Sequence, residues 1–140
     1  MDNHTITEDR LLDVIWERES REMLDGRVRL LQPATGYRVA LDTLVLAAAI
    51  EAEPGEAVLD VGAGVGAASL CLAVRVPGVR VVGIEMQREL VSLASRNIQL
   101  NGLQDRVEMI VAEAAPRPPP RLAGRTFQHV TAHAPPVAPA

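Results

Sequence analysis

Two acids and a run of glycines have the residue types and spacing of a site for a nucleoside. The segment Gly62–Gly66 carries glycine at alternate positions, and Asp60 stands just before it at the end of an apolar run. Glu85 follows the next apolar run, residues 79–84. Glycines allow close backbone approach to a ligand, and an acid at a strand tip can accept both ribose hydroxyls. The pattern predicts a nucleoside site with bare backbone N–H groups at a helix N-terminus.

The glycine spacing and the first acid narrow the choice of ligand. Dinucleotide sites have the pattern G-x-G-x-x-G, whereas this chain has G-x-G-x-G from Gly62 to Gly66. A carboxylate at Asp60 would repel a pyrophosphate but suits a ligand that carries an ammonium. S-adenosyl-L-methionine carries an ammonium group that suits Asp60 and a ribose that suits Glu85, and the glycine backbone can approach it closely. The spacing therefore favours this small-molecule cofactor and disfavours a nucleotide-dependent oxidoreductase.

Strand and helix patterns alternate around these residues. Short apolar, β-branched runs predict strands, and longer stretches with apolar residues at helical spacing predict helices. Alternation of this kind favours a parallel sheet with right-handed crossovers. We expect an α/β, Rossmann-like doubly wound, mostly parallel sheet with flanking helices. The expected strands are 57–61, 79–84, 107–111 and 127–131, and the expected helices are 67–76 and 87–100.

The segment Asp60–Gly66 together with Glu85 resembles the cofactor half of a class I S-adenosylmethionine-dependent methyltransferase. The lead-in at residues 26–42 resembles the family that methylates N6 of an adenine beside the anticodon of a valine tRNA. The resemblance covers residues 26–132. It implies tRNA or another RNA as a partner, and tRNA processing as the role. A complete domain of this kind has more strands than the four counted here, so the fold is expected to be C-terminally truncated.

Site residues follow from the motif and from the resemblance. The motif gives the acids and the glycine loop, and the resemblance adds residues after the second and third strands and before the first. Glu113 would hold the adenine amine, although a surface glutamate without a role is the alternative. Asp42 would line the methionine end, although a helix N-cap alone is equally compatible. The expected cofactor-binding residues are Asp60, Gly62, Ala63, Gly64, Gly66, Glu85, Met86, Glu113 and Asp42.

The segment after the fourth strand departs from the family pattern. Amino-directed methyltransferases carry Asn-Pro-Pro-Tyr there, which orients the target nitrogen and stacks on the base. This chain has Ala132-His133-Ala134-Pro135-Pro136-Val137. His133, Pro135 and Pro136 are the candidate catalytic residues of an altered motif. A non-catalytic cofactor-binding or interaction subunit, and a relative that methylates protein glutamine at N5, stay open as alternatives.

The chain is expected to form two parts. Residues 1–25 predict an amphipathic helix over 7–24, and residues 26–140 predict the cofactor-binding domain. Within that domain, residues 27–31 and 37–41 predict a hairpin or two extended arms. Asp42 would then cap a helix over 43–52.

Composition limits the remaining possibilities. The 140 residues are 48% apolar, enough for one domain with a core, and the net charge of −4 gives no global attraction to nucleic acid. The lone Cys71 excludes an internal disulfide and is expected to be a buried apolar residue. We expect a cytoplasmic protein without a membrane span. The fourth strand is expected at a sheet edge, where a homodimer or a heteromeric partner could pair.

Overall fold

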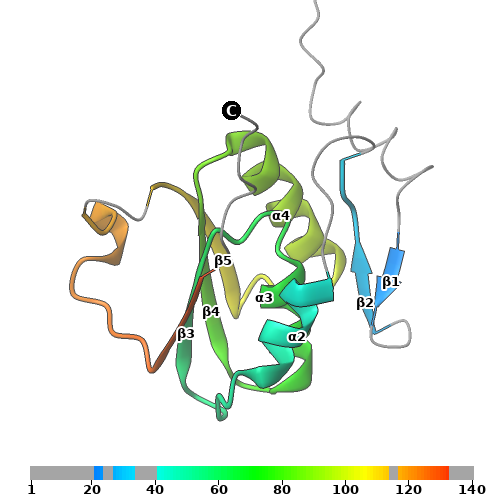
Figure 1. The fold of residues 1–140 in the computed structure, drawn as a ribbon, viewed down its shortest axis with the longest axis horizontal. Coiled ribbons are helices and arrows are strands. Elements are labelled where there is room, and N and C mark those ends of the chain that lie inside the picture. The colour runs from blue at the N-terminus through cyan, green and yellow to red at the C-terminus, as the bar shows by residue number, and fades with distance from the viewer. Residues whose placement is uncertain (1–20, 24–26, 34–40, 114–116, 133–140) are drawn as a thin grey trace, which may run out of the picture.

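The computed structural model describes residues 21–23, 27–33, 41–113 and 117–132 (Figure 1). Its strands and helices alternate through the central part of the chain. The strands are β1 (Arg21–Met23), β2 (Val28–Leu30), β3 (Ala57–Val61), β4 (Arg80–Glu85), β5 (Val107–Val111) and β6 (His129–Ala132). The helices are α2 (Leu41–Ala49), α3 (Ala67–Arg75), α4 (Arg88–Leu100) and the short 3₁₀ turn η1 (Pro120–Leu122).

Four strands form a parallel sheet in the order β5-β4-β3-β6. Asp60 of β3 lies in register with Gly83 of β4 and with Thr131 of β6, and Gly83 lies in register with Met109 of β5. The carboxyl ends of all four strands therefore meet at one edge, where ligands bind in open α/β sheets. The predicted Rossmann-like fold class is confirmed.

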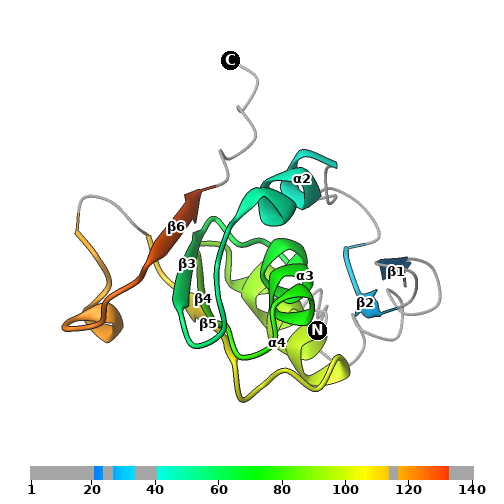
Figure 2. The same cartoon turned by 90° about the horizontal axis from the view of Figure 1, so that it is seen from below.

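The two faces of this sheet are covered unequally. Helices α2, α3 and α4 lie on one face, and the segment that leads into β6, from residue 117 through η1, lies on the other (Figure 2). The larger core fills the helical side and includes Leu70, Leu72 and Leu93. The smaller cluster on the opposite side centres on Val82, Ile84, Ile110 and Leu122. Most of the hydrophobic stabilisation therefore comes from the helical side.

The β5–β6 connection is fixed to the sheet by arginines. Arg125 donates to Glu108 Oε1 at 2.6 Å, and Arg121 lies 3.6 Å from Glu108 Oε2. The Arg125 guanidinium also lies 5.9 Å from the centre of the Phe127 ring. Proline removes backbone donors and resists formation of an α-helix, so this segment covers the sheet as an irregular strap that contains the 3₁₀ turn η1. We call residues 117–127 the strap below.

The N-terminal hairpin differs from the expected one. Strand β2 pairs antiparallel with β1, so residues 21–23 supply the partner strand. These residues were expected to end a helix, and that prediction is wrong at its C-terminal end because pairing with β2 fixes them as a strand. Residues 7–20 and 37–40 lie outside the described residues. The division of the chain at residue 25 into two parts stays a prediction.

The observed bounds of most helices and strands agree with the predicted ones. Strands β3 and β5 have the predicted bounds, and α3 and α4 agree to within a residue. Helix α2 begins at Leu41, so Asp42 falls inside its first turn and the N-cap assignment is wrong. Strand β4 includes Glu85 as its last residue. Gly102 ends α4 with φ +67°, and Leu103 N donates to Ile98 O, as expected for a glycine C-cap.

Cys71 lies in α3 with only 7% of its surface exposed. Burial disfavours the thiolate and raises the pKa of the Cys71 thiol from 9.0 to about 11. The interpretation as a small apolar core residue agrees with this environment.

We therefore expect an aromatic disulfide reagent at pH 8 to modify Cys71 in the folded protein far more slowly than in urea. Because the folded-state pKa is raised, Cys71 should also cost stability as the pH rises above 9, through the interval up to about 11. Cys71→Ala should remove this part of the alkaline loss in thermal melts. Equal labelling rates in the folded and unfolded protein would contradict the prediction.

Within the part of the chain that the structure describes, no helix has the length and apolar character needed to cross a membrane.

Candidate functional site

The glycine loop joins β3 to α3 at the carboxyl edge of the sheet. Gly62, Gly64 and Gly66 all have positive φ, at 73°, 58° and 89°. Residues with a Cβ rarely adopt this conformation, so the loop needs glycine at each of the three positions. The loop brings the N-terminus of α3 to the ligand-binding edge, as the sequence predicted.

The loop's own amides are used inside the protein. Gly62 N and Ala63 N both donate to Ile84 O, at 2.8 and 3.1 Å, and Gly66 N donates to Ala63 O at 3.0 Å. Gly64 N donates to Glu85 Oε1 at 3.0 Å. The expectation of bare N–H groups in the loop is therefore wrong for these four residues. What the loop offers a ligand is close approach, since the glycines carry no side chain.

Asp60 lies under the loop and is only 1% exposed. Its Oδ2 accepts a hydrogen bond of 2.7 Å from Ser69 Oγ on α3. This bond ties the end of β3 to the first turns of the helix that follows the glycine loop. The negative charge of Asp60 therefore lies directly behind the loop. A direct contact between Asp60 and a ligand ammonium stays a prediction.

Glu85 at the end of β4 connects two segments of the site. Its Oε1 accepts from Gly64 N, and its Oε2 accepts from Gln87 N at 2.9 Å. Glu85 is 8% exposed, so the carboxylate is almost fully enclosed. A carboxylate has about four lone-pair sites, so acceptor capacity is left for a ligand diol after these two bonds. Glu85 shapes the glycine loop as well as the edge beside it.

Apolar side chains lie at the tips of β4 and β5. Met86 is 58% exposed and Val111 is 39% exposed, and Ala112 N donates to Glu85 O at 3.1 Å. The two tips are thus joined by backbone beside the Glu85 carboxylate. Exposed apolar side chains at a ligand-binding edge suit the flat face of a base.

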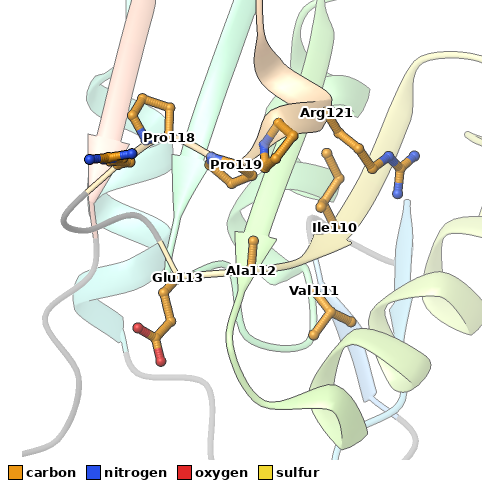
Figure 3. Close-up of a pocket in the computed structure, with 9 residues that line it drawn as sticks. Ile110, Val111, Ala112, Glu113, Pro118, Pro119 and Arg121 are labelled. Carbon is orange, nitrogen blue, oxygen red and sulfur yellow. The ribbon is translucent and has the colours of Figure 1, made fainter.

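A cavity of about 500 Å³ opens between the end of β5 and the strap. Ile110, Ala112 and the prolines line it, and Glu113 and Arg121 lie among its walls (Figure 3). The Glu113 side chain points away from Pro118 and Pro119. The cavity therefore has an apolar interior, with Glu113 turned to its outer side.

The structure brings together many of the predicted site residues. Asp60, the glycine loop, Glu85, Met86 and Glu113 all lie at the carboxyl edge of the sheet. The side chain of Asp42 lies outside the description, as do His133, Pro135 and Pro136 altogether. Their proposed roles stay predictions.

Sequence reasoning missed two polar residues beneath this edge. Ser69 binds Asp60, and Asn97 of α4, which is 0% exposed, donates from Nδ2 to Val65 O at 2.9 Å. Asn97 stands next to Ile98 in an apolar helix pattern. The signal in the sequence was the position of Asn97 in this apolar pattern, because a buried asparagine needs hydrogen-bond partners.

Comparison with protein families shows to which family the chain belongs. The TRM5/TYW2 methyltransferase domain matches residues 44–127, which include α3, α4, the glycine loop and both acids. This chain belongs to the TRM5/TYW2 methyltransferase domain family. The expected class I S-adenosylmethionine-dependent methyltransferase fold is thereby confirmed.

Curated proteins that resemble this TRM5/TYW2 methyltransferase domain act on proteins. The release factor glutamine methyltransferase of Chlorobaculum tepidum is 30% identical over 93 residues, which is 65% of this chain and 31% of that protein. The protein-L-isoaspartate O-methyltransferase of Aeropyrum pernix is 42% identical over 67 residues, which is 47% of this chain and 26% of that protein. The chain thus spans about a third or less of these relatives.

Solved structures give the same fold. The YcgJ protein from Bacillus subtilis aligns with a TM-score of 0.54 and 26% identity, over 66% of this chain and 38% of that one. A SAM-dependent methyltransferase from Geobacter sulfurreducens, in complex with S-adenosyl-L-homocysteine, aligns with a TM-score of 0.50 and 30% identity, over 57% and 34%. The expected cofactor, S-adenosyl-L-methionine, is confirmed by the family match and by the fold shared with this SAM-dependent methyltransferase.

Proposed function

We propose that this chain binds S-adenosyl-L-methionine at the glycine loop and belongs to an enzyme that methylates N6 of an adenine in tRNA. The observation that supports the cofactor most strongly is the internal use of the loop amides by Ile84 and Glu85. A pyrophosphate needs free N–H donors at such a loop. A sulfonium nucleoside needs close approach and negative charge instead, which glycines and acids supply.

The residues present fit the parts of this cofactor. Glu85 would accept the ribose hydroxyls, with Met86 and Val111 against the adenine and Glu113 near its amine. Asp60, behind the loop, would provide the negative field for the ammonium end. When bound, the cofactor supplies an electrophilic methyl group. The protein's part is to hold that methyl group in line with the target nitrogen.

Calorimetric titration tests the cofactor directly. We expect S-adenosyl-L-methionine and S-adenosyl-L-homocysteine to give saturable heats, and NAD to give none under the same conditions. Binding of NAD with equal or greater affinity would overturn the proposed ligand. Absence of heat with all three would remove the cofactor proposal altogether.

The target of methylation rests on the lead-in at residues 26–42, which resembles the tRNA family. A second candidate is protein glutamine, favoured by the similarity to the release factor enzyme. Methyl transfer from labelled cofactor to unmodified tRNA and to a release factor separates the two. Cofactor binding without transfer to either would support the non-catalytic alternative, which the altered segment around His133 motivates.

Strand β6 would be the site of a partner. Among the strands that the structure describes, β6 lies at one edge of the sheet, and its Val130 is 64% exposed. Edge strands with apolar side chains pair with other chains. We expect self-association, or pairing with an active methyltransferase subunit. Light scattering that gives a monodisperse monomer across the accessible concentration range would contradict self-association.

A further inference from the structure

Asn97 of α4 and Asn101, the C-cap residue of that helix, bind Arg29 of β2 and the following Leu31 as a neighbouring strand would. Arg29 N donates to Asn101 Oδ1 at 2.8 Å, and Asn101 Nδ2 donates to Arg29 O at 2.7 Å. Leu31 N donates to Asn97 Oδ1 at 2.7 Å, and Asn97 Nδ2 donates to Leu31 O at 2.9 Å. Each side-chain amide thus satisfies both backbone groups of one residue, as a ladder partner does.

The spacing of the four residues explains why this works. Four residues of a helix rise about 6 Å, and two residues of a strand advance about 6.6 Å. Asn97 and Asn101 are one turn apart on one helix face, while Arg29 and Leu31 lie on the same edge of the chain. The other edge of β2 pairs with β1. Strand β2 is therefore held between a true strand and a helix that carries two amides.

Only one of these two asparagines also reaches the glycine loop. Asn97 Nδ2 donates its second hydrogen bond to Val65 O at 2.9 Å, between Gly64 and Gly66. Asn101 Nδ2 instead donates its second bond to Asn97 O within α4, at 2.7 Å. Asn97 is 0% exposed, so water does not compete for these bonds. The Asn97 amide is therefore a direct link between Leu31 of the lead-in and Val65 of the loop.

We propose that Asn97 is a positioning residue that couples the docking of Leu31, the residue after β2, to the conformation of the glycine loop. Any event that orders the loop then orders Leu31 through one shared amide, and release of Leu31 from Asn97 loosens the loop. The consequence for the cofactor rests on the proposed function, whereas the coupling itself does not. By this link, the N-terminal hairpin contributes to the cofactor site without touching the cofactor.

The first test compares Asn97→Ala with Asn101→Ala in hydrogen exchange without cofactor. Each change removes two bonds to the segment Arg29–Leu31, so Asn101→Ala should speed exchange at Arg29 and Asn97→Ala should speed exchange at Leu31. Only Asn97→Ala should also speed exchange at Gly66, by about tenfold for the loss of one buried bond. Equal Gly66 rates in the two variants at matched global stability would overturn the coupling, because a merely structural role predicts equality.

The second test uses the unmodified chain, so that it holds even if Asn97→Ala fails to fold. Native-state exchange at rising denaturant should place the Leu31 and Gly66 amides in one opening unit with a common free energy and denaturant slope. Gly66 remaining protected after Leu31 has opened would refute the proposal.

The third test adds S-adenosyl-L-homocysteine. Asn97→Ala should weaken its binding about tenfold while Asn101→Ala changes it less than twofold. Equal affinity losses in the two variants would count against coupling to the cofactor. If the unmodified chain binds no cofactor, the proposed function fails, and the two exchange tests still decide the role of Asn97.

Discussion

Glu85→Ala is expected to weaken binding of S-adenosyl-L-methionine at least a hundredfold. The change removes the acceptor of Gly64 N and of Gln87 N, and it removes the proposed acceptor of the ribose hydroxyls. Hydrogen bonds to a charged group contribute roughly 1.5–3 kcal/mol each, and about 1.4 kcal/mol corresponds to tenfold in affinity. The loss of the two proposed bonds to the ribose hydroxyls is by itself enough to weaken binding by about a hundredfold. Calorimetric titration well below the melting temperature measures it.

Two further variants separate the ligand contact from general damage. Glu85→Gln keeps one carbonyl acceptor in the same place and should lose less affinity than Glu85→Ala. Glu89→Ala removes an exposed acid from the first turn of α4 and should leave the affinity within twofold. If Glu85→Ala bound the cofactor as tightly as Glu89→Ala, Glu85 would have no place in the site.

Gly83→Ala is expected to be the most destabilising single-methyl change in the sheet. A Cβ at this position would lie 2.2 Å from Met109 Sδ and 2.8 Å from Ala63 Cβ. Met109 can move, but Ala63 Cβ is fixed to the backbone of the glycine loop. Overpacking of this kind typically costs about 1–3 kcal/mol, and the strain here acts on the loop itself. Thermal melts should show a lower midpoint, and cofactor affinity should fall with it.

A double variant tests the mechanism of that loss. The double variant Gly83→Ala with Met109→Ala should lose less stability than the sum of the losses in the two single variants. The reason is that removal of the Met109 side chain makes room for the new methyl group at position 83. Gly124→Ala meets open space and carries only the strain of φ +76°. Its cost should add to that of Met109→Ala without coupling. Additive behaviour of Gly83→Ala with Met109→Ala would show that the contact is not the cause.

The sequence was sufficient for elements whose signals are local. Strands β3 and β5 are short apolar runs bounded by turn residues, and α4 has helical spacing with a glycine stop. Strand β1 was mispredicted because three residues carry little local preference, and pairing with β2 decides their conformation. The edge of the sheet that carries Asp60 and Glu85 was predicted because both acids follow strands of an expected parallel sheet, whose carboxyl ends meet at one edge.

The hydrogen bonding of the site could not be predicted in the same way. The glycine pattern suggested free amides, but Ile84 O accepts from two of them across the sheet, and no sequence signal specifies this. The pairing of Asn97 with Leu31 depends on how β2 lies on α4. Both are tertiary contacts between segments far apart in the chain, so they follow only once the fold is assembled.

The order of strands in the sheet has a consequence for how this chain folds as it is made. The partner of β3 on one side is β6, and the hydrogen bond from Ala57 N to Gln128 beside that pair spans 71 residues of sequence. Such a pairing closes a long loop, and the entropy of closure delays it. During synthesis, β4 and β5 emerge from the ribosome before β6 does, so they can associate with β3 while its other edge still awaits a neighbour.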